Sequence, residues 1–499
     1  KTLTYVGVGA TFLLAIAPFL PVNTQWLWLM VMFVIANVGL NGAGVFYNAL
    51  LPHMGTDDEM DDISNRAFAY GYFGGGILLL IHMVLLIVTD YAEWATQLSM
   101  ITAAMWWYGF ALLTFKWVPE PPIENEMESL GIIESTKFSL SEIKKTLSDT
   151  GKFRTLFIYM LAYFFFIDGI NTVTALGGVF GTVVLGLTMI DLIITILAIQ
   201  FVAAPAALMF TKIAEKKGTK NALTFSLVCW VVLCIGALSF APLELESHDE
   251  HDVLFEWDQE DNLYNVSISE NAHDLAQKLD YDGEEFDEQA WARDWIHILP
   301  ATQNEDLGTI EWLESDETVS LGNISDEEII LFLNSVDETR FSASVSGGAL
   351  DLNASVGVDH PTSLGDGSLD FIPIAVRGSV WQPLGMTVFW QFLLLGCGMG
   401  TLLGGSQGLA RSLFGQMVPE TRSAEFFGFF GFFGKVAAFI GPLLYGTMTV
   451  LFDSRVGLLS VGTLIFIGAL MMRFVNVENG RADALEEDAR NRGITTSEE

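Results

Sequence analysis

Residues 67–89 read AFAYGYFGGGILLLIHMVLLIVT, and this stretch contains no Asp, Glu, Lys or Arg. The hydrocarbon core of a bilayer is about 30 Å thick, so a helix of about 20 apolar residues is needed to cross it. Backbone N–H and C=O groups find no water in lipid, so a crossing segment must satisfy them internally as a helix. Residues 67–89 therefore predict a membrane-spanning helix and exclude a single soluble domain.

Other segments along the chain are equally long and apolar, which gives ten predicted spans. They are residues 2–20, 26–50, 67–89, 94–117, 155–180, 189–210, 221–243, 384–408, 424–451 and 456–473. Short alternating segments, which are typical of transmembrane β-barrels, do not occur. The predicted fold class is an all-α polytopic membrane protein.

Charge is distributed very unevenly along this chain. The 499 residues include 60 acidic and 24 basic ones, a net charge of −36, yet 51% are hydrophobic. Residues 244–383 hold 33 of the acidic residues and four basic ones, a net charge of −29, which leaves −7 for the rest. An acidic soluble block is thus inserted in an apolar chain. The acidity excludes nonspecific binding to nucleic acid, which requires clustered basic residues.

The orientation follows from the short loops, because cytoplasmic loops are enriched in Lys and Arg. With Lys1 cytoplasmic, the basic residues of the short loops all fall on the cytoplasmic side except Arg455. We therefore expect a multi-pass protein of the cell membrane with residues 244–383 outside. The chain enters its first span directly after Lys1, and we expect further sequence to precede it.

The acidic block is too rich in aromatic residues for a purely disordered segment. Residues 325–336 have helical periodicity, and residues 339–356 alternate around Gly347-Gly348 as a hairpin does. We expect a small α+β domain with a mobile acidic entry at 244–262, and its protein partner is unknown. His248 and His251 are interpreted as part of a solvated linker, so no metal site is predicted.

Several motifs carry a family resemblance. They are Phe46-Tyr47-Asn48-Ala49-Leu50-Leu51-Pro52, Asp168-Gly169-Ile170-Asn171-Thr172-Val173, Phe180-Gly181-Thr182-Val183-Val184-Leu185-Gly186-Leu187, and Gly404-Gly405-Ser406-Gln407-Gly408-Leu409-Ala410-Arg411-Ser412-Leu413-Phe414. Together they resemble the vacuole-effluxer-like family, major facilitator superfamily proteins related to autophagy-associated vacuolar amino-acid exporters. The likeness covers nearly all spans but not residues 244–383.

This resemblance implies twelve helices in two six-helix halves, with the ten spans here matching helices three to twelve. The expected divisions are the rest of the N-terminal half (1–117), a cytoplasmic linker (118–154), the first part of the C-terminal half (155–243), the acidic exterior domain (244–383), the rest of the C-terminal half (384–473) and a cytoplasmic tail (474–499). The resemblance implies amino-acid efflux by alternating access. A non-transporting receptor or sensor that displays the acidic domain is the alternative.

Polar residues at membrane depth are costly and are therefore candidates for function. Asp168 lies near the middle of its span, and we expect it to bind a proton or a substrate ammonium group, unless it caps a helix break. Asn171 shares its helical face. Lys435 is expected either to receive a substrate carboxylate or pair with Asp168, or to extend its amine to the surface.

A polar stripe is formed by Asn37, Asn41 and Asn48, and Gln407 is a weaker candidate of the same kind. These side chains suit a solute pathway, and hydrogen bonding between helices is an equally weighted alternative. Small residues recur at every fourth position at Gly396, Gly400, Gly404 and Gly408, which predicts close helix packing.

The string Gly404–Gly408 also fits a hydrolase pattern, but that motif requires a strand–turn–helix elbow and here lies in an apolar helix. No enzyme and no cofactor are therefore predicted. Glu215 and Lys216 stand where the resemblance places a charged cytoplasmic loop. With Arg411, Arg422 and Glu425 they are the predicted cytoplasmic gate between the halves, and solvated loop charges are the alternative. Thr188-Met-Ile-Asp191 predicts a capping box.

Overall fold

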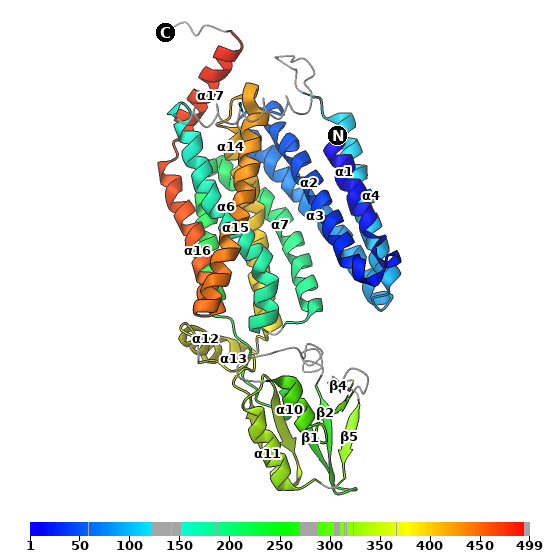
Figure 1. Ribbon diagram of the computed structural model, residues 1–499. Helices are drawn as coiled ribbons and strands as arrows, with labels where there is room; N and C mark the ends of the chain where they lie inside the picture. Colours follow the sequence, from blue (N-terminus) through cyan, green and yellow to red (C-terminus); the bar gives the residue numbers. More distant parts are fainter. Residues whose placement is uncertain are drawn as a thin grey trace.

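The computed structural model describes residues 1–57, 59–120, 141, 151–185, 187–269, 287–303, 310–313, 315, 317–322, 324–365 and 367–493. It consists of long helices and one inserted unit with a β-sheet (Figure 1). Most of the predicted linker, 118–154, and the last residues of the predicted tail lie outside the described residues. The predicted division into domains therefore stays a prediction.

Within the described residues, nine helices are long and apolar enough to cross a membrane. They are α2 (Val22–Ala49), α3 (Met60–Val88), α4 (Glu93–Trp117), α6 (Arg154–Leu185), α7 (Met189–Lys217), α8 (Thr219–Ala237), α14 (Val388–Gly415), α15 (Ser423–Leu451) and α16 (Ser454–Met471). The polytopic membrane fold predicted from the sequence is confirmed.

The first predicted span, residues 2–20, differs from the other nine. It forms helix α1 (Thr2–Leu14), followed by a 3-10 turn at Ala17–Phe19. Pro18 and Pro21 lack the backbone N–H that a continuing helix needs. Thirteen residues rise about 20 Å, which is less than the bilayer core, although α1 still packs along α2 and α4.

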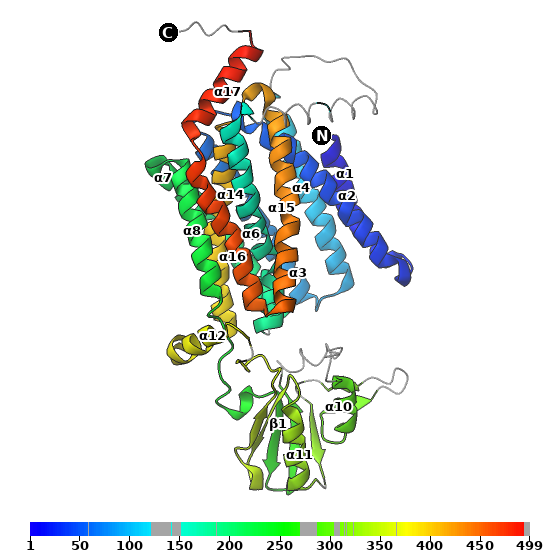
Figure 2. The same ribbon diagram turned by 60° about the vertical axis from the view of Figure 1, so that its left-hand side comes forward.

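The helices form two groups that meet at a few elements. Helices α6, α7, α8, α14, α15 and α16 pack against one another, and α1 to α4 lie beside them (Figures 1 and 2). Contacts between the groups are made by α3 on α7 and α14, and by α2 on α15. We call these the N-terminal group and the C-terminal group.

The start of α7 illustrates how local sequence sets a helix boundary. The Thr188 side chain accepts a hydrogen bond from the backbone N–H of Asp191, and the Asp191 carboxylate accepts one from the Thr188 N–H in return. This reciprocal pair satisfies two N–H groups that lack helical partners. The predicted capping box is confirmed.

The inserted unit contains a mixed five-stranded sheet in the order β5-β2-β1-β6-β7, and a separate pair, β3 with β4. The strands are β1 (Val253–Asp258), β2 (Leu263–Ile268), β3 (Ala301–Gln303), β4 (Ile310–Trp312), β5 (Thr318–Leu321), β6 (Ser342–Ser346) and β7 (Ala354–Val356). Strands β1 and β6 run parallel, and the other neighbours run antiparallel. Two helices, α10 (Glu288–Asp294) and α11 (Asp326–Val336), accompany the sheet.

The predicted helix at 325–336 and the hairpin around Gly347-Gly348 are both confirmed. The predicted mobile entry at 244–262 is wrong, because residues 253–258 form β1, the central strand of the sheet. Val253 and Phe255 alternate with more exposed residues and are fully buried. This burial of alternate side chains stabilises a strand despite the acidic residues around it.

The bundle has two chemically different ends (Figure 1). The inserted unit lies beyond one end. The other end carries the turn between α2 and α3, the turn between α7 and α8, residues 416–422 and the polar helix α17 (Val477–Asn491). We call this second end the basic end, because Lys216 and Lys217 end α7 there and Arg490 lies in α17.

Candidate functional site: a polar cluster at the basic end

Arg411 lies near the end of α14, in the C-terminal group, and is buried. Its Nε donates to Ser64 Oγ at 2.9 Å, its Nη2 to the Ser64 carbonyl at 3.0 Å, and its Nη1 to Asn48 Oδ1 at 3.1 Å. Both partners belong to the N-terminal group. The guanidinium also lies 4.7 Å from the centre of the Phe68 ring, within cation–π range. Arg411 therefore connects the two groups of helices.

Asp61, in the first turn of α3, makes a second connection. Its carboxylate accepts hydrogen bonds from Ser412 Oγ at 2.5 Å and Thr219 Oγ1 at 2.6 Å, and a longer one from Gln416 Nε2. These donors come from α14, from the residue after it and from the start of α8, all in the C-terminal group. A carboxylate in the first turn of α3 is also favoured by the helix dipole.

Ser64 and Asn65, about one turn after Asp61 on α3, make a third connection between the two groups. Asn65 Nδ2 donates to Thr211 Oγ1 of α7 at 3.0 Å, and Ser64 Oγ donates to the carbonyl of Gly408 at 2.7 Å. We call these residues the basic-end cluster. Its members are Asn48, Asp61, Ser64 and Asn65 of the N-terminal group, and Thr211, Thr219, Arg411, Ser412 and Gln416 of the C-terminal group.

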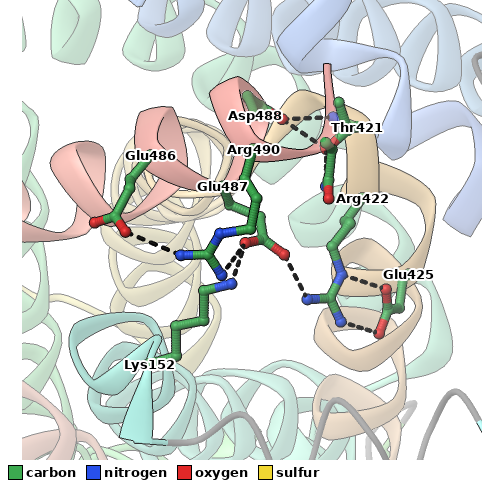
Figure 3. A network of polar contacts seen from close by, with 9 residues as sticks. Lys152, Thr421, Arg422, Glu425, Glu486, Glu487, Asp488 and Arg490 are labelled. Atoms are coloured by element: carbon green, nitrogen blue, oxygen red, sulfur yellow. Dashed lines mark hydrogen bonds and ion pairs between the residues drawn. The ribbon is translucent and has the colours of Figure 1, made fainter. Parts of the chain in front are cut away.

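Arg422 and Glu425 were predicted to lock the halves together, and this role stays a prediction. They form a two-bond ion pair with each other, with both N···O distances at 2.8 Å, at the start of α15. Arg422 also pairs with Glu487 of α17 at 3.3 Å (Figure 3). The physical reason is spacing, since residues three apart face each other on one helix.

Glu487 is the centre of this network. It is buried and also pairs with Lys152, just before α6, and with Arg490 on its own helix (Figure 3). The neighbouring Asp488 accepts hydrogen bonds from the backbone N–H groups of Glu420 and Thr421, both at 2.9 Å. Helix α17 is therefore fastened to the starts of α6 and α15.

The side chain of Arg481 connects α17 with the basic-end cluster. Its Nη2 donates to Gln416 Oε1 at 2.6 Å, and its Nε lies 3.4 Å from a carboxylate oxygen of Asp57 in the N-terminal group. Glu215 and Lys216, by contrast, are exposed at the end of α7. In the part of the chain that the structure describes, neither forms an ion pair, so their place in a gate stays a prediction.

Asp168 is buried in α6 and contacts the backbone of α15 in the middle of that helix. Its Oδ1 accepts a hydrogen bond from the backbone N–H of Gly441 at 2.9 Å. Pro442 follows inside α15, where it donates no hydrogen bond and pushes against the preceding turn. A side chain at Gly441 would bring its Cβ to 2.7 Å from Asp168 Oδ1, so glycine permits this contact. The carboxylate therefore contacts α15 next to its internal proline.

Lys435 does not pair with Asp168. It is exposed on α15, and among the described residues it forms no ion pair. Asn171 is partly buried on the face of α6 that carries Asp168. The exposure of Lys435 agrees with the alternative that its amine extends to the surface, and its role toward a substrate stays a prediction.

The predicted stripe of asparagines divides into two kinds of residue. Asn37 and Asn41 donate to backbone carbonyls of their own helix, those of Phe33 and Asn37. Asn48 instead belongs to the basic-end cluster. Gln407 accepts a hydrogen bond from Tyr72 of α3 at 2.7 Å, so it also joins the two groups.

The glycine ridge of α14 faces α7. A Cβ atom at Gly396 would lie 2.5 Å from Thr195, one at Gly400 would lie 2.7 Å from the carbonyl oxygen of Ile199, and one at Gly404 would lie 2.8 Å from the amide of Ala207. Gly408 continues the ridge onto α3, where Asn65 is its neighbour. The backbones of these helices can approach closely because the side chains are missing.

A small pocket, partly open to the outside, lies within the C-terminal group. Its lining is apolar and includes Phe180, Met399 and Tyr445, with Thr172 one turn of α6 from Asp168. In the described residues, no group of three or more His, Cys, Asp or Glu side chains is arranged to hold a metal ion.

Sequence reasoning missed Asp61, Ser64 and Glu487. Asp61 and Ser64 look like ordinary residues of an acidic loop, and Glu487 looks like one charge of a polar tail. Their partners lie far away in the chain, so only the fold identifies them.

These observations define a class. The chain is a multi-pass integral membrane protein whose two helix groups meet through buried polar contacts at the basic end. A family model described as "Vacuole effluxer Atg22 like" matches residues 2–243 and 370–485, and the chain belongs to this family. The resemblance seen in the sequence is confirmed, and the match leaves out most of the acidic insertion.

Individual relatives agree with this assignment. The chain is 30% identical over 238 residues to the "Uncharacterized MFS-type transporter YxiO" of Bacillus subtilis, which covers 46% of this chain and 53% of that protein. It is 33% identical over 120 residues to "Autophagy-related protein 22-2" of Emericella nidulans, covering 24% of this chain and 20% of the relative. The chain thus spans about half the length of the first relative and about a fifth of the second.

Proposed function

We propose that this protein moves a small polar solute across the membrane by alternating access, and that the basic-end cluster is the gate at one end. The observation that carries the proposal is the buried guanidinium of Arg411. It belongs to the C-terminal group and donates to Asn48 and Ser64 of the N-terminal group. Membership of the effluxer family supports the same conclusion.

The chemistry of this contact suits a gate. Arg411 is bonded to uncharged oxygens of Asn48 and Ser64, and a hydrogen bond to a charged group contributes roughly 1.5–3 kcal/mol. A few such hydrogen bonds stabilise the closed conformation by a few kcal/mol. The binding free energy of a solute can offset this amount, because the two conformations of a switching protein differ by a few kcal/mol in free energy. Water that enters as the groups separate replaces the lost bonds.

For the substrate, we propose amino acids, moved outward from the cytoplasm. Family membership supports this choice, together with the expected orientation, which sets the basic end in the cytoplasm and the insertion outside the cell. We further propose that Asp168 carries a coupling proton. Its burial in α6 and its contact with α15 beside Pro442 support that role.

The test is transport by the full-length protein in proteoliposomes loaded with labelled amino acids, with and without a pH gradient. We expect solute movement that Arg411→Gln slows by about tenfold or more, since the loss of one charge-assisted hydrogen bond amounts to about a factor of ten. Arg66→Gln is the matched control. Arg66 is exposed and, within the described residues, pairs along its own helix with Asp62.

The receptor alternative predicts a different result in the same experiment. No amino acid would then move, and Arg411→Gln and Arg66→Gln would be indistinguishable. Movement that is present but equal in both variants would show transport without this gate.

A further inference from the structure

Residues 371–384 form a short irregular helix between the sheet and the bundle. It consists of α12 (Phe371–Val376), a π-helical turn (Arg377–Trp381) and α13 (Gln382–Leu384). Its sequence, FIPIAVRGSVWQPL, has no acidic residue and one basic residue, although it belongs to a block with a net charge of −29. The family match resumes at residue 370, so the segment belongs with the bundle rather than with the sheet.

One side of this segment is fixed to the rest of the chain. Pro373, Arg377 and Trp381, spaced by four residues, are buried. Arg377 pairs with Glu244 at 2.9 Å, and Trp381 Nε1 donates to the carbonyl of Ser239, just after α8, at 2.8 Å. The only charge of the segment is therefore compensated within the chain.

Several large apolar side chains of the segment are exposed around these buried residues. Phe371 is 68% exposed, Ile374 41% and Leu384 65%. In both ribbon views α12 lies crosswise to the long helices, at the end of the bundle that faces the sheet, and projects to the side (Figures 1 and 2). The segment then leads into α14, which begins at Val388.

We propose that residues 371–384 are an interfacial anchor that lies in the lipid leaflet on the side of the inserted unit. A short helix that exposes large apolar side chains next to a membrane can lie in the plane of the interface, with these side chains at the boundary between headgroups and acyl chains. The apolar surface of this segment is continuous with the spanning helix α14. The anchor holds the acidic unit at a set position above the membrane.

A soluble protein partner fits this surface less well. The acidic sheet attracts basic partners, but the exposed side of 371–384 offers them no acidic group. The inserted unit itself does not cover the face, since Phe371 and Leu384 stay exposed with that unit in place. This inference does not depend on the proposed transport activity, only on the membrane spans.

Spin labels test the proposal in a variant whose three cysteines are replaced by alanine. Labels at Phe371→Cys and Ile374→Cys in lipid nanodiscs are compared with two controls, Phe466→Cys on spanning helix α16 and Leu352→Cys on the β6–β7 hairpin. We expect oxygen to reach the labels at 371 and 374 several-fold more effectively than a water-soluble nickel complex does. The label at 466 should behave in the same way, whereas the nickel complex should reach the label at 352 more effectively than oxygen does. Access by the nickel complex as at 352, or shielding from both reagents, overturns the proposal.

A second measurement uses the unmodified full-length protein, so it does not depend on how the cysteine variants fold. Phosphatidylcholine with a photoreactive group in its acyl chain is cross-linked in nanodiscs, and the modified peptides are mapped by mass spectrometry. We expect adducts within 371–384 and on α16, with none on β6 and β7. Absence of adducts from 371–384, with α16 labelled, overturns the proposal.

Discussion

Asp168 combines two properties that usually conflict, because it is a buried acid and also a structural hydrogen-bond acceptor. Its Oδ1 holds the amide of Gly441 beside Pro442, where α15 lacks a regular helical bond. An asparagine at this position keeps the acceptor oxygen and loses the titratable proton. The two roles can therefore be separated by substitution.

We expect Asp168→Asn to fold with near-native stability and to lose transport driven by a pH gradient. Asp168→Ala should in addition lower the free energy of unfolding by about 1–3 kcal/mol, because it leaves a buried N–H without a partner. Thermal unfolding in detergent and proteoliposome transport measure the two effects. Unchanged proton-driven transport by Asp168→Asn would exclude the coupling role.

At the scale of the element, α14 depends on the glycine ridge that it presents to α7. Gly400→Ala should destabilise the protein by about 1–3 kcal/mol, because the new methyl group would meet the Ile199 backbone, which cannot move aside as a side chain can. Gly446→Ala in α15 is the matched control, since nothing lies within 4 Å of its Cβ. That change should be neutral or stabilise by about 0.5–1 kcal/mol. Equal unfolding temperatures for the two variants would contradict the packing account.

Helix α17 depends on one buried carboxylate. Glu487→Gln should weaken the pairs with Lys152 and Arg422, and a loss of roughly 1.5–3 kcal/mol increases local opening by about tenfold or more. The adjacent Glu486 pairs with Arg490 at the surface, where such a pair contributes about 0–1 kcal/mol, so Glu486→Gln should change little. Hydrogen exchange of α17 amides measures both. If the two variants exchange alike, Glu487 does not fasten the helix.

For the whole molecule, the sequence predicts elements better than contacts. The spans, the capping box at Thr188 and the hairpin at Gly347 depend on residues close in the chain, so periodicity and local hydrogen bonding suffice. In the basic-end cluster, Asp61 contacts Thr219 and Ser412, which lie on helices distant in the sequence. No local pattern encodes that meeting. For Lys435 the sequence left open both a pair with Asp168 and an amine that extends to the surface, and only the fold shows that the side chain is exposed.

The whole-molecule claim is that the two helix groups separate at the basic end during transport. Its most direct test is the distance between spin labels at Thr56→Cys, before α3, and Lys216→Cys, at the end of α7, in the full-length protein in lipid. We predict one short distance without solute, and a second, longer distance that grows with a transported amino acid and in the Arg411→Gln background. A single distance that neither solute nor Arg411→Gln changes would contradict the account.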